Sequence, residues 1–210
     1  VKYADEIIVL SKGVQSYFWE NYRRKTIFIP NGVNKAEKQK TNEIVRKFGL
    51  VKNDYILYVG RLVPEKGLVY LIRAFKMIHT TKKLVIAGGA SDTNEFEDEL
   101  RKLATGDERI IFTGFVQGKV LEELYSNAYI YVLPSDLEGM PLSLLEAMSY
   151  GNCCLVSDIE ECSAVVEENA IIFRRGDISD LKDKLQMAID SENLVNKIGS
   201  VSAEFICNKY

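Results

Sequence analysis

The sequence contains a single histidine, His79, and none of its four cysteines forms a C-x-x-C pair. A structural zinc site uses about four such side chains at short spacings, so no metal site is expected. Cys153 and Cys154 are adjacent in the apolar run CCLVS, which is typical of a buried strand. Thiols without a disulfide pattern indicate a reducing, cytoplasmic setting. His79 ends a helical segment and is interpreted as structural or exposed.

The sequence also lacks a large excess of either charge and lacks long apolar runs. The 27 Lys and Arg against 30 Asp and Glu give a net charge of −3, and the only basic cluster is YRRK at residues 22–25. Nucleic-acid binding through bulk charge is therefore not expected. No apolar run approaches the ~18 residues of a membrane-spanning helix, and the start lacks the features of a signal peptide. Because the chain begins at Val1 without Met, we expect it to be a fragment of a longer protein.

Two nucleotide-binding motifs, G-x-G-x-x-G and G-x-x-x-x-G-K-[ST], are absent, which argues against a dehydrogenase-type dinucleotide fold and a P-loop. Apolar runs instead alternate with helical periodicity from residue 54 onward. Runs without polar alternation are typical of strands covered on both faces, so we predict an α/β fold with a parallel, doubly wound six-stranded sheet. The six runs are YILYVG (from 55), KLVIAG (83), RIIFTG (109), YIYVLP (129), CCLVS (153) and AIIF (170).

The first thirty residues do not follow this rhythm. The runs ADEIIVLS and TIFIP predict two strands, and the segment through Tyr17 and Trp19 between them predicts a helix. PNG at residues 30–32 predicts a turn or hinge, and the polar stretch after it a linker.

Two cations follow the first strand of the main sheet, in the loop RLVPEKG. Arg61 and Lys66 both project from a strand's carboxyl end, where Gly60 permits close approach and Gly67 opens the next helix. A planar guanidinium, an ammonium and a helix N-terminus together suit a diphosphate. The alternative is an ordinary solvated loop.

Glycine-rich loops follow the next two strands at the same edge, in GGASDTNE from Gly88 and TGFVQG from residue 113. These glycines are compatible with a nucleotide base packing on the backbone, and Phe115 or Val116 would supply an apolar wall. Glycines at strand ends also serve merely as turns.

The stretch SDLEGMPLSLLEAMSYG carries two glutamates, Glu138 and Glu146, around a Gly-Met-Pro turn. The pattern predicts strand, loop and helix, with Pro141 at the first helical position and Gly151 after the end. Glu138 then lies in a loop at the carboxyl edge, where ligands bind in open α/β sheets. Two solvated carboxylates near a helix start are the simpler alternative.

Taken together, the chain resembles the carboxyl-terminal domain of the family-4 retaining glycosyltransferases, which have the GT-B fold. The resemblance rests on NGV, VGRLVPEKG, LVIAGG, IIFTGFV, A-x-I-x-V-L-P-S and EGMPLSLLEAMSYG, the last matching that family's E-x7-E motif. It implies that residues 1–32 are a remnant of the preceding domain with the hinge, and that residues 33–210 bind the nucleotide sugar. The two orphaned strands of the remnant are then expected to lack their sheet and to be poorly ordered or to pair with another copy.

The resemblance also implies roles for individual residues. Arg61 and Lys66 match the pair that binds the donor diphosphate, Glu146 matches the glutamate that bonds the ribose, and Glu138 the one that contacts donor-sugar hydroxyls. The further residues expected to contact the nucleotide sugar are Gly60, Gly88, Phe115, Val116, Gly139, Met140, Leu142 and Ser143.

The implied function is transfer of a hexose from a nucleoside diphosphate sugar, UDP- or GDP-linked, with retention and without a cofactor. Polysaccharide biosynthesis is the expected setting. The acceptor, a glycan or a lipid-linked sugar, would bind through the missing N-terminal domain, and the full-length protein could associate peripherally with the inner face of the membrane. This fragment alone is expected to be inactive. The alternatives are a non-catalytic nucleotide-sugar-binding module and an epimerase of similar fold, whose catalytic groups have no counterpart in the sequence.

Overall fold

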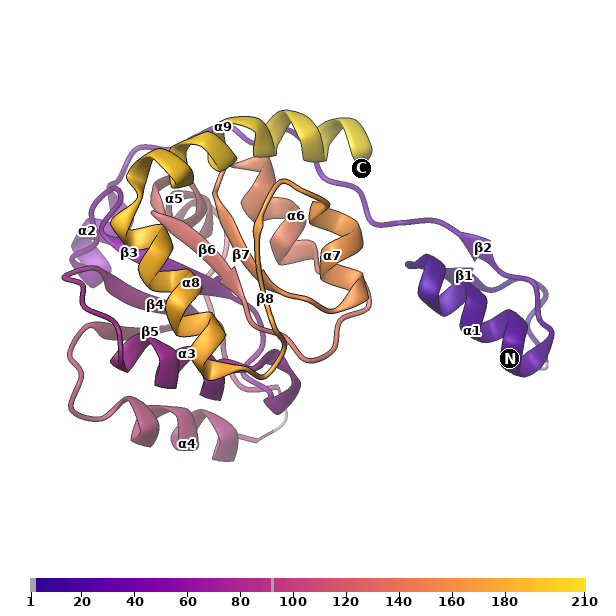
Figure 1. Ribbon diagram of the computed structural model, residues 1–210, viewed down its shortest axis with the longest axis horizontal. Coiled ribbons are helices and arrows are strands. Elements are labelled where there is room, and N and C mark those ends of the chain that lie inside the picture. The colour runs from indigo at the N-terminus through magenta and orange to yellow at the C-terminus, as the bar shows by residue number, and fades with distance from the viewer. Residues whose placement is uncertain (1–2, 92) are drawn as a thin grey trace.

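The computed structural model describes residues 3–91 and 93–210. An N-terminal unit stands apart from the rest of the chain in Figure 1. It consists of β1 (Ile8–Val9), α1 (Lys12–Tyr22) and β2 (Ile27–Phe28). The two strands pair in parallel, with Ile8 opposite Ile27 and Val9 opposite Phe28. They were expected to lack their sheet and to be poorly ordered or to pair with another copy, but in the structure they form a two-stranded sheet with each other.

The main body contains a six-stranded parallel sheet in the order β5-β4-β3-β6-β7-β8. This confirms the predicted doubly wound sheet. The chain proceeds outward from β3 in one direction and from β6 in the other, so the topological switch point lies between these two strands. The strands are β3 (Tyr55–Val59), β4 (Lys83–Ala87), β5 (Ile110–Gly114), β6 (Ile130–Leu133), β7 (Cys154–Ser157) and β8 (Ile171–Phe173).

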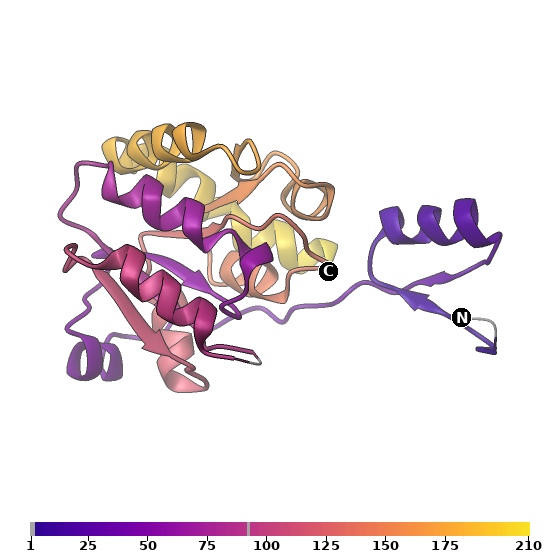
Figure 2. The same ribbon diagram turned by 90° about the horizontal axis from the view of Figure 1, so that it is seen from below.

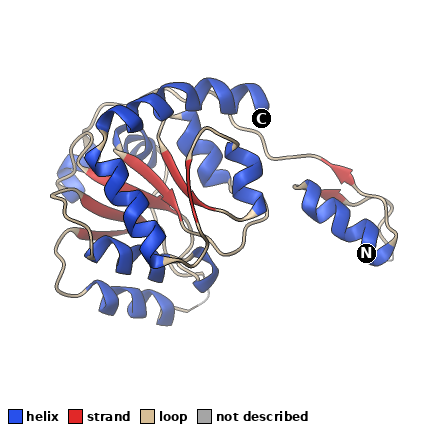
Figure 3. Cartoon of the chain, viewed as in Figure 1, coloured by secondary structure: helices blue, strands red, loops and turns tan. Residues whose placement is uncertain are grey.

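Helices cover both faces of this sheet (Figures 2 and 3). On one face α3 packs against α4 and α8, and on the other α2 packs against α5 and α6 against α9. None of the described helices is long and apolar enough to cross a membrane. The helices are α2 (Glu43–Phe48), η1 (Pro64–Lys66, a 3-10 turn), α3 (Leu68–Lys76), α4 (Glu95–Ala104), α5 (Lys119–Asn127), α6 (Leu142–Ser149), α7 (Glu160–Val166), α8 (Ile178–Asp190) and α9 (Glu192–Lys209).

The inner strands of the sheet are apolar because both of their faces are buried, whereas the edge strand β5 is only partly buried. The four residues of β6 are at most 1% exposed, and this includes Tyr131. A buried phenol needs a hydrogen-bond partner. Tyr131 donates to the Ser143 hydroxyl at 2.8 Å. Cys153 and Cys154 are buried, as CCLVS predicted, and burial raises the pKa of the Cys153 thiol to about 12. His79 is exposed, as expected.

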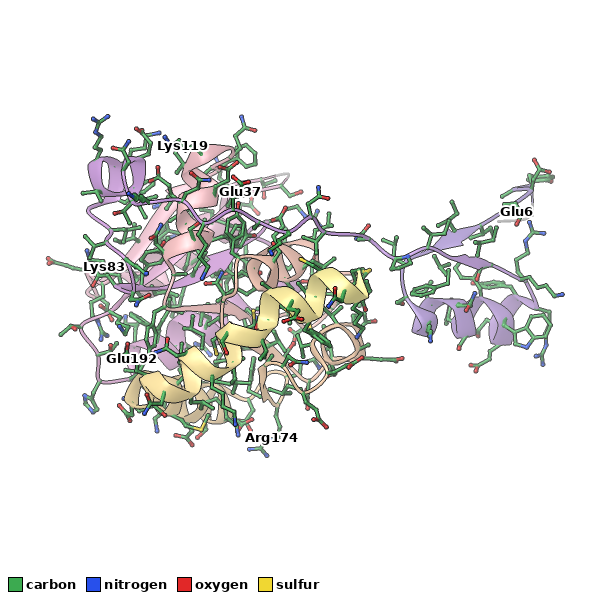
Figure 4. The ribbon with its side chains drawn as sticks, turned by 90° about the horizontal axis from the view of Figure 1, so that it is seen from above. Glu6, Glu37, Lys83, Lys119, Arg174 and Glu192 are labelled. Atoms are coloured by element: carbon green, nitrogen blue, oxygen red, sulfur yellow. The ribbon has the colours of Figure 1, made fainter. Side chains whose placement is uncertain are left out.

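The polar segment between β2 and α2 is irregular, as its composition predicted, but it is fastened to the main body. The amide of Gln39 donates to the Ser126 hydroxyl at 2.8 Å. The Glu123 carboxylate accepts from the amides of Asn42 at 2.9 Å and Ile44 at 3.1 Å, and so caps the start of α2 from a distant helix. Figure 4 shows Glu37 of this segment and Lys119 of α5 on the main body, far from Glu6 in the N-terminal unit.

Candidate functional site

The candidate residues gather at the carboxyl edge of the main sheet, around the switch point. Strand β3 leads into the loop with Arg61 and Lys66, and its neighbour β6 leads into the loop with Glu138. Ligands in doubly wound sheets bind in the crevice at this point, where the loops diverge to either side.

Arg61 has a fixed backbone and an exposed side chain. The buried Tyr58 hydroxyl donates to the Arg61 carbonyl at 2.9 Å. Burial raises the pKa of Tyr58, so the phenol remains a hydrogen-bond donor. The Arg61 guanidinium approaches only the Ser91 hydroxyl, at 3.5 Å, among the described residues. It is therefore available to an anion.

Lys66 is not open in the same way. Its ammonium lies 2.7 Å from Oε1 of Glu138, and the two side chains are 14% and 8% exposed. The Ser135 hydroxyl donates to the same oxygen at 2.7 Å. The family resemblance implied that Lys66 binds the diphosphate and Glu138 the sugar, but it did not predict that the two side chains form an ion pair with each other.

A glycine accounts for this approach. Gly67 has a φ of +66°, and a Cβ atom there would lie 2.0 Å from the carbonyl oxygen of Pro134, at the end of β6. Only glycine tolerates both conditions. The turn η1 therefore seats directly on the β6 loop, where the Asp136 amide donates to the Glu65 carbonyl at 2.8 Å.

Five of the predicted contact residues line one mainly apolar hollow of about 390 Å³. Phe115 forms an exposed part of its wall, at 77% exposure. At its base Gly88 has a φ of +156°, and a Cβ atom there would lie 1.8 Å from the carbonyl oxygen of Gly60. The predicted residues in the lining are Gly60, Arg61, Gly88, Phe115 and Val116, and Leu121 joins them.

Glu146 lines a second, larger cleft of about 570 Å³, together with Leu142, Tyr125 and the segment from Gly32 to Gln39. Leu121 of α5 lines both this cleft and the apolar hollow, so the two lie on either side of the same side chain. The Tyr125 hydroxyl donates to Oε2 of Glu146 at 3.0 Å.

Three of the predicted contact residues line neither the apolar hollow nor the larger cleft. The Ser143 hydroxyl is bound by Tyr131 from the core. Gly139 and Met140 line a separate pocket of about 330 Å³ on the side of the N-terminal unit. The Met140 sulfur and carbonyl accept from the Asn31 backbone and side chain at 3.1 and 3.2 Å.

The helix after this loop begins one residue later than predicted. Pro141 precedes α6, and its carbonyl accepts from the amides of Leu144 and Leu145. The amides of Leu142 and Ser143 are thus free of helical partners, as expected for a first turn. No cluster of three or more potential metal ligands exists within residues 3–91 and 93–210.

A family model described as "Glycosyl transferases group 1" matches residues 40–204. The chain belongs to the group 1 glycosyltransferases. Its six-stranded sheet is the C-terminal domain of a GT-B fold, as the sequence motifs predicted.

The similar glycosyltransferases are longer than this chain. An uncharacterized glycosyltransferase of Methanocaldococcus jannaschii is 34% identical over 167 residues, 73% of this chain and 42% of that protein. The capsular polysaccharide biosynthesis glycosyltransferase CapM of Staphylococcus aureus is 24% identical over 80% of this chain and 46% of its own length. The chain thus spans less than half the length of these relatives.

Solved structures agree with this group 1 assignment at the level of the fold. The crystal structure of Anabaena HepE in complex with UDP and glucose superposes with a TM-score of 0.87 at 20% identity, covering 99% of this chain and 59% of that one. Sucrose-phosphate synthase of Thermosynechococcus elongatus gives a TM-score of 0.81 at 26% identity, covering 97% and 53%.

Three residues of this candidate site were not predicted from the sequence. Tyr125, Ser135 and Asn31 hold Glu146, Glu138 and Met140 in place. Ser135 and Asn31 stand within recognised motifs, A-x-I-x-V-L-P-S and NGV, so those motifs were an available signal. Tyr125 lies in a helix between these motifs, and no motif pointed to it.

Proposed function

We propose that this chain is the donor-binding part of a retaining hexosyltransferase that uses a nucleoside diphosphate sugar. The observation that carries the proposal is the convergence of four features around one switch point: an exposed arginine, an apolar hollow, a partly buried Lys–Glu pair and a carboxylate held by a tyrosine. These groups match, in order, a diphosphate, a base, a phosphate-bound hexose and a ribose.

In the proposed mechanism the protein stabilises the departing diphosphate. Arg61 forks onto phosphate oxygens, Lys66 adds a point charge, and the free amides at the start of α6 supply hydrogen bonds. This is preorganised electrostatic stabilisation of charge that develops as the glycosidic bond breaks. In front-face displacement the acceptor attacks the anomeric carbon from the same face from which the diphosphate departs, so the anomeric configuration is retained.

The remaining residues position the donor. Glu146, held by Tyr125, accepts hydrogen bonds from the ribose hydroxyls, and Glu138 accepts from hydroxyls of the hexose. The base packs in the hollow between Gly88 and Phe115. Uracil is the favoured base because HepE, which has the same fold, was crystallised with UDP and glucose. A GDP-linked sugar is the alternative donor, and titration with UDP and GDP distinguishes the two.

The acceptor site belongs to a preceding domain, of which residues 1–32 are the end. With half of a two-domain cleft, the Arg61 guanidinium remains exposed to solvent, and its attraction for a diphosphate is screened. We therefore propose that the 210-residue chain binds nucleoside diphosphates with a dissociation constant on the order of 0.1 to 1 mM and transfers no sugar. The full-length enzyme would act in polysaccharide assembly, as CapM is named for, on a glycan or lipid-linked acceptor at the cytoplasmic face of a membrane.

Calorimetric titration with UDP, GDP and ADP tests the binding function. We expect saturable binding of one diphosphate in preference to the other two, and no measurable affinity for any of them would refute the proposal. Incubation with radiolabelled nucleotide sugars and an acceptor extract, beside a longer protein with the preceding domain, tests the enzymatic part. Transfer by the longer protein alone is expected. Transfer by neither would favour a non-catalytic nucleotide-sugar-binding module.

A further inference from the structure

The Lys66–Glu138 pair is built so that one carboxylate oxygen carries all of its bonds. The ammonium of Lys66 and the hydroxyl of Ser135 both donate to Oε1 of Glu138, each at 2.7 Å. Within the described chain Oε2 has no hydrogen-bond partner. The Glu138 carboxylate thus binds the Lys66 ammonium through Oε1, while Oε2 remains available to a hydrogen-bond donor from a ligand.

Ser135 is itself held rigidly. It is fully buried, and its carbonyl accepts a 2.6 Å hydrogen bond from the Ser157 hydroxyl at the end of β7. This chain of contacts links β7, the β6 loop and η1, so Glu138 does not need Lys66 in order to stay in position.

We propose that Glu138 is a specificity-determining residue that selects nucleotides carrying a sugar over the bare nucleoside diphosphate. This inference rests on the proposed function. A diphosphate that reaches Lys66 must draw the ammonium away from Glu138. A mostly buried carboxylate that loses its cation is costly unless another donor replaces it.

A hexose supplies that replacement. Its hydroxyls donate to the carboxylate, first to the open Oε2, while the diphosphate takes the ammonium. The sugar nucleotide therefore exchanges both members of the pair at once. A bare diphosphate takes the ammonium but offers no hydroxyl to the carboxylate, so Glu138 is left with the Ser135 hydroxyl alone. The resting pair in this way lowers inhibition by the nucleotide product.

The test is a set of calorimetric titrations with UDP and UDP-glucose and, in parallel, with GDP and GDP-mannose. Glu138→Gln keeps the shape and an acceptor for Ser135 but frees Lys66. We expect it to bind the bare diphosphate about tenfold more tightly, or ~1.4 kcal/mol, with no gain for the sugar nucleotide. Glu65→Gln is the matched control, since it removes a carboxylate from the same loop that does not pair with Lys66, and its affinities should change by less than about twofold.

A double variant separates competition for Lys66 from plain charge repulsion. In a Lys66→Met background, or Lys66→Gln if the first does not fold, Glu138→Gln should no longer strengthen diphosphate binding. The same tenfold gain in that background would overturn the inference, because the carboxylate would then act through space and not through the lysine. An unchanged or weaker affinity of Glu138→Gln for the bare diphosphate would overturn it as well.

The outcomes distinguish this inference from the proposed function. If the unaltered chain binds neither diphosphate, both fail. If it binds one and Arg61→Ala weakens that binding while Glu138→Gln does not strengthen it, the nucleotide site stands and only the selection by Glu138 is refuted.

Discussion

The hydroxyl of Tyr125 in α5 donates a 3.0 Å hydrogen bond to Oε2 of Glu146 in α6. The Tyr125 ring is stacked on Tyr150, with centroids 5.5 Å apart and planes inclined by 14°. Burial raises the pKa of Tyr125 well above its usual value, so the phenol keeps its proton at any physiological pH. The carboxylate proposed to bind the ribose is therefore oriented before a ligand arrives.

Removing the Tyr125 hydroxyl should weaken the binding of nucleotides equally, whether or not they carry a sugar. For Tyr125→Phe we expect the affinities for UDP and UDP-glucose to fall alike, by about three- to tenfold, the value of one hydrogen bond. Glu146→Gln should lower both affinities further. Tyr129→Phe is the control, because the Tyr129 hydroxyl donates to Ala188, away from the cleft. A loss confined to UDP-glucose would place Glu146 at the sugar instead.

The exposed Arg61 should be the main free cation of the diphosphate site. Arg61→Ala is expected to weaken nucleoside diphosphate binding about ten- to a hundredfold, the cost of one charge-assisted contact. The thermal unfolding midpoint should stay constant because the side chain makes a single long contact at 3.5 Å. Arg73→Ala, on the exposed side of α3, serves as the charge-matched control. Equal affinities of the two variants in calorimetry would contradict the phosphate assignment.

Gly67 should be far less tolerant of a side chain than Gly49. Both have φ near +60°, at +66° and +61°, but a Cβ atom at position 49 meets nothing within 4 Å. Gly49→Ala should cost only the left-handed backbone strain, about 1 kcal/mol. Gly67→Ala adds the collision with Pro134 and should cost about 3 kcal/mol or more of the free energy of unfolding. Urea denaturation of both variants measures this, and equal losses would contradict the backbone contact.

Glu123 should stabilise the fold in a pH-dependent way. Burial disfavours its charged form, but the amides of Asn42 and Ile44 donate to the carboxylate, and the net effect is a lowered pKa. A lowered folded-state pKa contributes stability that is present above the unfolded-state value, about 4.3, and is lost as pH falls through the folded-state value.

Glu123→Gln should therefore lower the free energy of unfolding at pH 7 by about 1 to 3 kcal/mol. The difference from the unaltered chain should shrink below about pH 4. Glu99→Gln on the exposed side of α4 provides the control and should change little. Denaturation curves at several pH values decide the matter, and a difference that stays constant with pH would disprove the charged role.

Much of this protein could be read from local patterns. Six apolar runs with intervening helical periodicity fixed the parallel sheet, because a strand covered on both faces is apolar throughout. Motifs placed Arg61, Lys66, Glu138 and Glu146 at one edge, since the carboxyl ends of parallel strands meet there.

The sequence by itself thus determined the elements, the class of sheet and the edge that carries the site. Tertiary structure decided which loops touch. Lys66 and Glu138 are 72 positions apart and become an ion pair because β3 adjoins β6 and Gly67 seats η1 on Pro134. The pairing of β1 with β2 was decided in the same way. Strand adjacency depends on the packing of the whole chain, which no local run of residues encodes.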